Sequence, residues 1–207
     1  MSERLPDRYF DALYAQAPDP WQLAQRWYEQ RKHAITMALL PAARYRHAFE
    51  PGCSVGLLTE QLTARCDHVT ATDVAAAALD ATEGRLTRAG RRDTATLLRS
   101  SFDTPWPAGD FDLVVLSEVG YYLSAARLRA VLDRECLRLA PDATLIAAHW
   151  RHPVADYPLS GDRTHHIIAA TAGLHHLGGY RDADVVIDVF STGSALSVAA
   201  RTGVPGA

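Results

Sequence analysis

Hydrophobic positions along this chain recur at two different spacings. Between residues 21 and 40, apolar side chains return every three or four positions, which is typical of an amphipathic helix bounded by Pro20 and Pro41. Short apolar runs predict strands instead, at residues 45–50, 69–72, 94–98, 111–117 and 144–149. Helical spacing between and after these runs predicts helices at residues 55–64, 75–88, 124–139 and 164–174.

The order of these elements predicts an α/β fold. Strands that alternate with helices form a mostly parallel sheet with helices on both faces. The strand at 111–117 contains four consecutive apolar residues, as expected of a strand buried on both sides. The end of the chain breaks the alternation, because residues 184–190 and 195–200 read as two strands around a glycine-containing link at 191–194. A link of that length predicts a C-terminal antiparallel hairpin.

Composition and charge narrow the possible function classes. The 207 residues are 48% hydrophobic and 22% charged, which fits a single domain over residues 1–207. A formal net charge of −3 argues against a nucleic-acid partner. No apolar run reaches the length of a membrane helix, and the charged N-terminal residues are unlike a signal peptide. The three cysteines lack metal-ligand and redox-pair spacing, so we expect a reduced, cytoplasmic setting.

A glycine turn follows the first predicted strand. Residues 49–56 read Phe-Glu-Pro-Gly-Cys-Ser-Val-Gly, and Asp73 ends the second strand about twenty positions later. A strand, a glycine turn, a helix and a delayed acid are how α/β folds hold a nucleoside, with the acid on the ribose. The spacing of a dinucleotide-binding turn is not met, because Ser54 and Leu57 stand where glycines would be. The turn therefore predicts a nucleoside ligand without a pyrophosphate.

This turn resembles motif I of the class I S-adenosylmethionine-dependent methyltransferases, whose pattern is roughly [ED]-x-G-x-G-x-G. The chain keeps Glu50, Gly52 and Gly56 of that pattern and has Ser54 in its middle position. The resemblance implies a Rossmann-like seven-stranded sheet and S-adenosyl-L-methionine as cofactor, with S-adenosyl-L-homocysteine as product. It also implies cofactor contacts from the motif and from the end of the second strand, namely Glu50, Gly52, Cys53, Gly56, Asp73 and Val74.

The loop after the third strand, at residues 100–103, lies against adenine in this family. The resemblance therefore implies that Phe102 covers the base and that Ser101 or Asp103 bonds its edge. The alternative is an ordinary turn before Pro105, with Phe102 in the core. The spacing does not decide between Ser101 and Asp103.

The segment Leu-Ser-Glu-Val-Gly-Tyr-Tyr-Leu at 116–123 narrows the resemblance further. It is similar to the NodS-like nodulation N-methyltransferases, which act on the amino group of a deacetylated chitooligosaccharide. Glu118 would then lie beside the methyl donor, where a carboxylate can orient or deprotonate an amine. The alternative is a strand-end acid that bonds backbone amides and only holds the cofactor. One of the two tyrosines should be in the core, and we predict Tyr122 at the substrate mouth.

The N-terminal region, residues 1–40, also matches this family in kind and is expected to cover the cofactor. Trp21, Tyr28 and Arg31 are its predicted contacts. Tyr28, Arg31 and Lys32 fall within about one helical turn and can share a face, and a guanidinium can bind the methionine carboxylate with two hydrogen bonds. The alternative is an amphipathic cover helix whose basic residues are solvated.

The segment after the fifth strand is rich in side chains that bind sugars or amines. His149, Trp150, His152 and Asp162 are the predicted substrate contacts, and His149 is also a candidate general base. A hydrogen-bonded structural histidine is the alternative. The histidine pairs at 165–166 and 175–176 lack an acid or cysteine that would complete a familiar metal site, so no metal is expected.

These features together predict a methyltransferase for a small-molecule acceptor, with an amine of a saccharide or aminosugar preferred. Two alternatives remain open. One is a small-molecule O-methyltransferase on the same fold, for which His149 would be the natural base. The other is a non-catalytic protein that binds S-adenosylmethionine and serves as a partner subunit, since fold alone does not establish catalysis.

Overall fold

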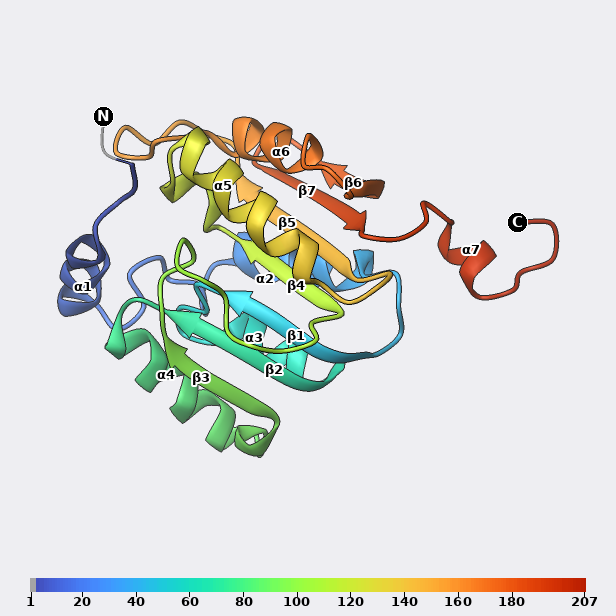
Figure 1. Ribbon diagram of the computed structural model, residues 1–207. Coiled ribbons are helices and arrows are strands. Elements are labelled where there is room, and N and C mark those ends of the chain that lie inside the picture. Colours follow the sequence, from blue (N-terminus) through green and yellow to red (C-terminus); the bar gives the residue numbers. More distant parts are fainter. Residues whose placement is uncertain (1–2) are drawn as a thin grey trace.

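Seven strands form one sheet in the computed structural model, which describes residues 3–207 (Figure 1). The strand order is β3-β2-β1-β4-β5-β7-β6, in which β1 to β5 run parallel and β7 lies antiparallel to both β5 and β6. The predicted fold class is confirmed. The strands are β1 Tyr45–Pro51, β2 Cys66–Asp73, β3 Ala95–Arg99, β4 Leu113–Ser117, β5 Thr144–Trp150, β6 His175–Arg181 and β7 Val185–Ser191.

Helices cover both faces of this sheet (Figure 1). The helices are α1 Asp7–Gln16, α2 Trp27–Leu39, α3 Leu57–Thr63, α4 Ala76–Arg88, α5 Ala125–Glu135, α6 Gly161–Ala169 and α7 Val198–Arg201. Three short 3₁₀ turns accompany them: η1 Arg92–Thr94, η2 Gly120–Tyr122 and η3 Cys136–Arg138. None of the helices in the described part of the chain has both the length and the apolar character that a membrane span requires.

Alternating side chains of the central strands build two separate cores. Leu113 and Val115 of β4 pack into the cluster that includes α2, α3 and α4, whereas Val114 and Leu116 pack into the cluster that includes α5 and α6. Successive side chains of a strand point to opposite faces, so one continuous apolar run supplies both cores. This explains why polar and apolar residues do not alternate along β4.

The predicted C-terminal hairpin exists, but one of its strands was placed wrongly. The partner of β7 is β6, which precedes it, whereas residues 195–200 form no strand and contribute to the short helix α7. The helix predicted at 164–174 ends at Ala169, and the chain then turns into β6 at His175. The β6 sequence contains two glycines and few apolar residues, and its side chains are mostly exposed. An edge strand needs no continuous apolar run, so hydrophobic periodicity does not reveal it.

The helix predicted between residues 21 and 40 is shorter than expected. It begins only at Trp27, and a separate helix, α1, precedes it at residues 7–16. Residues 19–26 form turns, in which the carboxylate of Asp19 accepts hydrogen bonds from the amides of Leu23 and Ala24. An aspartate that bonds nearby amides competes with helix formation. These turns separate Trp21 from α2, and α1 lies beside the carboxyl ends of β1 and β2 (Figure 1).

Candidate functional site

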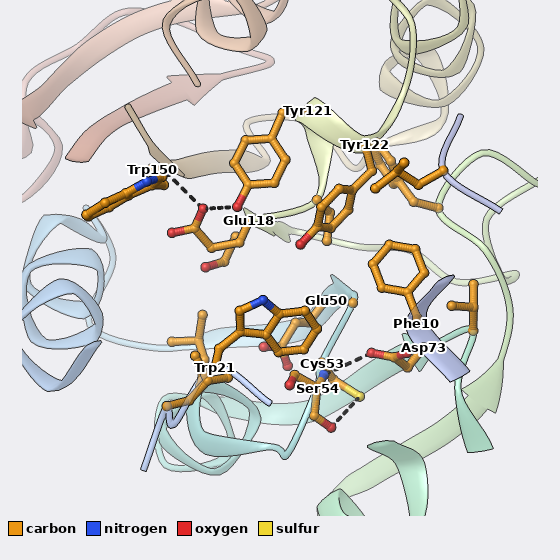
Figure 2. Close-up of a pocket in the computed structure, with 18 of the residues that line it drawn as sticks. Phe10, Trp21, Glu50, Cys53, Ser54, Asp73, Glu118, Tyr121, Tyr122 and Trp150 are labelled. Carbon is orange, nitrogen blue, oxygen red and sulfur yellow. Dashed lines mark hydrogen bonds between the residues drawn. The ribbon is translucent and has the colours of Figure 1, made fainter. Parts of the chain in front are cut away.

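A cavity of about 370 Å³ lies where the carboxyl ends of the parallel strands meet the N-terminal helices. Ligands of open α/β sheets bind at this edge, where the strand order reverses, and β1 and β4 are the strands at that reversal here. Figure 2 shows the residues that point into the cavity from the ends of β1, β2, β4 and β5 and from the N-terminal segment.

One wall of the cavity is the glycine turn after β1. Gly52 and Gly56 have φ angles of +73° and +75°, and Ser54 between them has a φ of +51°. A Cβ atom on Gly52 would lie 2.3 Å from the Cγ1 of Val119, so the close approach of two loops requires glycine there. Gly52 lines the cavity, whereas Gly56, at the start of α3, packs on Thr82 of α4 and does not line it.

Asp73 closes this wall from the end of β2. One carboxylate oxygen accepts the amide of Ser54 at 3.0 Å, and the other accepts the amide of Ala75 at 3.0 Å. Burial outweighs these hydrogen bonds and raises the pKa of Asp73. The carboxylate thus fixes the glycine turn relative to β2, and Val74 beside it also lines the cavity.

Two further predicted turn residues, Glu50 and Cys53, line the cavity as well. Glu50 is buried, accepts a hydrogen bond from the hydroxyl of Thr59 at 2.6 Å, and has its pKa raised by burial to about 8. Its carboxyl therefore holds a proton at neutral pH unless a cation lies beside it. Burial likewise raises the pKa of the Cys53 thiol well above its ordinary value, so this cysteine is no thiolate.

The loop after β3 places Ser101 and Phe102 on the cavity wall. Phe102 is also part of the core behind the sheet, so the two alternatives for this side chain are not exclusive. Asp103 does not reach the cavity: it is buried behind Ser101, whose hydroxyl it accepts at 2.5 Å, and is paired with Arg127 at 2.9 Å. The prediction of Asp103 as a direct ligand contact is therefore not met in this structure.

Glu118 forms the opposite wall, directly after β4. Its backbone has a φ of +58°, a left-handed conformation that is uncommon for a residue with a side chain. One carboxylate oxygen lies 2.6 Å from the ammonium of Lys32, and the other accepts the Tyr121 hydroxyl and the Trp150 amide, the latter at 2.9 Å (Figure 2). The side chain thereby joins α2 to the ends of β4 and β5. Strained backbone held by such contacts is frequent at functional sites.

Lys32 is buried between two carboxylates. Its ammonium contacts Glu118 and also Glu29, at 2.7 Å, and only 2% of its side chain is exposed. Burial alone would lower the pKa of Lys32, but the two carboxylates outweigh burial and raise it. Burial raises the pKa of Glu29 despite the nearby ammonium. The site thus places two carboxyl groups against one ammonium.

Aromatic side chains from the N-terminal segment cover the cavity. The ring of Phe10 packs edge-on against Tyr122 at 4.9 Å, and the Tyr14 hydroxyl is 2.6 Å from the Ser54 hydroxyl. Trp21 packs against Tyr14 and lies between Glu118 and the glycine turn (Figure 2). The region that we expected to cover a ligand therefore lies over the cavity.

Tyr28 lines the cavity from the first turn of α2 and packs against Trp150 at a ring distance of 5.0 Å. Its hydroxyl is buried and has no hydrogen-bond partner among the residues that the structure describes. Burial raises the pKa of Tyr28, so the hydroxyl keeps its proton. An unsatisfied buried donor costs free energy, which a ligand that accepts its hydrogen bond would recover.

Arg31 does not share the cavity face with Tyr28 and Lys32, and that prediction is wrong. Its guanidinium donates to Asp182 at 2.9 Å and to the hydroxyl of Tyr180, on the β6–β7 hairpin. Tyr28 and Lys32 are four residues apart and lie on one side of α2, whereas each single step along a helix turns the side chain by about 100°. Of Arg31 and Lys32, Lys32 is thus the one that α2 directs to the site.

His149 also lies outside the cavity, although it was predicted as a base and a substrate contact. It has no exposed surface, its Nε2 accepts the amide of Gly120 at 3.0 Å, and its Nδ1 is 3.0 Å from His165. Burial, followed by the charges of His165 and Lys32, lowers the pKa of His149 well below the usual range. The structural alternative applies to His149, which cannot touch a ligand in this arrangement.

His152 and Asp162 are likewise absent from the cavity wall. His152 pairs with Asp184 at 2.7 Å, and Asp162 pairs with Arg151 and Arg181 at 2.9 and 3.0 Å. These surface contacts hold the segment after β5 against the β6–β7 hairpin. Of the four residues predicted in this segment, Trp150 alone reaches the cavity.

Several cavity residues were not predicted. Phe10 and Tyr14, four positions apart, show the spacing of one helix face, and this signal could have identified α1 as a wall. Tyr157 gave no local signal, since only tertiary contacts bring it to Tyr122. Glu29 lies three residues before Lys32 on α2, and this spacing could have identified it as a partner of Lys32. Within the described residues there is no group of three or more potential metal ligands.

Comparison with known proteins adds a family relationship to this geometry. The sequence model of the family described as nodulation protein S (NodS) matches residues 11–174. Nodulation protein S of Rhizobium tropici is 33% identical over 132 residues, or 63% of this chain and 54% of that protein. The Bradyrhizobium diazoefficiens protein is 32% identical over 130 residues, or 62% and 61%. The matched region thus spans between half and two thirds of these relatives.

Solved structures show the same architecture. A putative methyltransferase from Pseudomonas syringae is 39% identical, with a TM-score of 0.68 over 80% of this chain and 99% of that one. The N-methyltransferase NodS from Bradyrhizobium japonicum WM9, in complex with S-adenosyl-L-homocysteine, is 23% identical, with a TM-score of 0.78 over 89% and 96%. At that identity the second likeness establishes the fold.

Replacement of Lys32 tests the electrostatics of the site. We expect Lys32→Met to lower the free energy of unfolding by about 3 kcal/mol, because it leaves the buried carboxylate of Glu29 and the partly buried carboxylate of Glu118 without a cation between them. Urea denaturation followed by circular dichroism measures this change. The double variant Lys32→Met/Glu118→Gln should recover most of the loss, and equal stability of the wild type and Lys32→Met would contradict the buried ion pairs.

Proposed function

This chain belongs to the nodulation protein S (NodS) family, and we propose that it transfers a methyl group from S-adenosyl-L-methionine to a small-molecule acceptor. The observation that carries this proposal is the position of Glu118 and Asp73 on opposite walls of one cavity. Asp73 is then placed to hold the ribose of the cofactor, and Glu118 faces it from the other side of the cavity, toward the sulfonium.

The residues of the cavity suit this cofactor. Asp73 offers carboxylate oxygens to ribose hydroxyls, and Ser101 and Phe102 offer an edge contact and a covering ring to adenine. The buried hydroxyl of Tyr28, which lacks a hydrogen-bond partner among the described residues, can donate to the methionine carboxylate. When bound, S-adenosyl-L-methionine supplies a methyl group that is already activated on a sulfonium, so positioning and exclusion of water are what the protein must provide.

For the acceptor we propose an amine, with an amine of a saccharide or aminosugar as the preferred case. Glu118 reaches the cavity from a rigid position and can orient an ammonium or take its proton. The carboxyl groups of Glu29 and Glu118 beside Lys32 offer acceptors to an ammonium, and Trp150 supplies an aromatic ring to the cavity lining on which a sugar can stack. The structural relative from Bradyrhizobium japonicum is an N-methyltransferase, which supports the same reaction class.

The O-methyltransferase alternative loses its main support, because it relied on His149 as the base for an alcohol and His149 lies outside the cavity. An alcohol must lose its proton during attack, whereas an amine can lose it to water beforehand. A protein that binds S-adenosylmethionine without turnover differs from our proposal only in activity, so turnover is the measurement that separates them.

The first test concerns the cofactor end of the cavity. Asp73→Ala should weaken binding of S-adenosyl-L-methionine by one to two orders of magnitude, or roughly 1.4–2.8 kcal/mol, through loss of charge-assisted hydrogen bonds to the ribose. Isothermal titration calorimetry on the folded variant measures this. Asp67→Ala, an exposed acid on the same strand, is the matched control. Unchanged affinity in Asp73→Ala would remove this residue from the site.

A second test concerns the N-terminal cover. Backbone amides of residues 15–32 should exchange more slowly with solvent after S-adenosyl-L-homocysteine is added, because Trp21 and Tyr28 gain a ligand to pack against. Hydrogen–deuterium exchange with mass spectrometry resolves this segment, and β3, which the cavity scarcely touches, serves as the internal reference. Equal exchange in both states would contradict a cover that responds to the cofactor.

The third test separates chemistry from support at Glu118. Glu118→Gln should keep donor affinity and lower turnover of an aminosugar about 10- to 1000-fold, since the amide preserves shape but cannot take a proton or balance a cation. Turnover of labelled S-adenosyl-L-methionine against deacetylated chitooligosaccharides and simple aminosugars provides the assay. Glu60→Gln, on the far side of α3, is the control. Weaker donor binding with full turnover at saturating donor would assign Glu118 to cofactor support.

A further inference from the structure

A line of four side chains runs from the interior of the protein to its surface. His149 of β5 lies 3.0 Å from His165 of α6, His165 lies 2.6 Å from Asp188 of β7, and Asp188 lies 3.0 Å from His176 of β6. His149 has no exposed surface, whereas 53% of the His176 side chain is exposed. None of these residues lines the cavity.

The hydrogen-bond partners along this line determine which ring nitrogen of His149 and of His165 carries the proton. The amide of Gly120 is a donor, so the Nε2 of His149 must accept and the neutral ring carries its proton on Nδ1. That proton points to the Nε2 of His165, which must therefore carry its own proton on Nδ1 and donate it to Asp188. Burial opposes ionisation of Asp188, but the hydrogen bonds from His165 and His176 outweigh it and lower the pKa of this carboxyl.

The inner end of the line holds the turn that carries the cavity tyrosines. Gly120 begins η2, whose Tyr121 donates its hydroxyl to Glu118 and whose Tyr122 faces the cavity. A Cβ atom on Gly120 would lie 2.5 Å from the Cγ2 of Thr164 and 3.1 Å from the Nε2 of His149. The turn is therefore packed directly on α6 and on the first histidine of the line.

We propose that His149, His165 and Asp188 form a positioning chain that fixes the Gly120 turn, so that Tyr121 holds Glu118 in its working conformation. The chain transfers no proton to a substrate, because the Nε2 of His149 already faces an amide donor. This proposal rests on the proposed methyltransferase function for its kinetic consequences, whereas its geometric content can be measured without turnover.

An additional proton has no place in the chain. On the Nε2 of His165 it would face the Nδ1–H of His149, and on the Nε2 of His149 it would face the amide of Gly120. The other charged or titratable groups around the pair are Lys32 from α2, Tyr121 from η2, and Asp188 with His176 from the hairpin. The charge of Asp188 favours the extra proton, and the charge of Lys32 disfavours it. Acid should therefore loosen the turn. Without the carboxylate of Asp188, a lower pH should be needed for the same effect.

The first measurement is independent of activity. Two-bond ¹H–¹⁵N correlation spectra of the wild-type protein at neutral pH should show His149 and His165 both protonated on Nδ1. Assignment comes from the single variants of each histidine. A proton on the Nε2 of His149 would overturn the chain, whatever reaction the protein catalyses.

The second measurement uses Asp188→Asn, which keeps the shape of the side chain, and His165→Leu, which interrupts the line. We expect both to retain affinity for S-adenosyl-L-homocysteine within about twofold and to lower kcat about tenfold or more, with the acid limb of the kcat profile of Asp188→Asn moved to lower pH. His166→Leu, the exposed neighbour on the same helix, should behave as the wild type.

Two results would overturn the positioning role while leaving the proposed function intact. One is a kcat within twofold of the wild type in Asp188→Asn, with its acid limb unmoved. The other is a loss of affinity and of stability with kcat fully recovered at saturating donor and acceptor. Absence of turnover in the wild type itself would instead count against the proposed function, and the tautomer spectra would still decide on the chain.

Discussion

The site depends on one buried interaction, the contact of the Lys32 ammonium with the carboxylates of Glu29 and Glu118. Lys32 is the only lysine among the 207 residues, and arginine supplies every other fixed positive charge of a side chain. A compact ammonium can donate to both carboxylates at once. Because the contact joins α2 to the end of β4, it fixes the cover helix and the strand-end carboxylate relative to each other.

The two walls of the cavity are held in different ways. Asp73 accepts the amide of Ser54 in the glycine turn and the amide of Ala75 just after β2, so that wall is set by backbone hydrogen bonds at the ends of β1 and β2. The wall around Glu118 is held by the ammonium of Lys32, which comes from a distant part of the chain, and by the hydroxyl of Tyr121, three residues away. Buried charges are costly to keep, and a well-packed apolar replacement is often as stable. Their presence beside a cavity is therefore better explained by ligand chemistry than by stability.

The segment after β5 shows how the same residue types serve two purposes. Histidines, acids and an aromatic residue gather there, but most of them form ion pairs or lie in the interior, and Trp150 is the member that meets the cavity. The composition of this segment predicts a binding surface, but most of these side chains contact other parts of the protein and do not line the cavity. His149 in particular contacts the Gly120 turn from behind, at a point from which it can influence the cavity without touching a ligand.

Local patterns in the sequence were sufficient for the parallel sheet, the glycine turn and the position of Asp73, because strand and helix periodicity and positive-φ glycines are properties of short segments. They failed for β6, whose edge position needs no apolar run, and for the face of α2 that Arg31 occupies. Whether Lys32 or Arg31 enters the site depends on how α2 is rotated against the sheet. That rotation is set by packing between segments more than eighty residues apart, as in the contact of Lys32 with Glu118, and only the tertiary structure decides it.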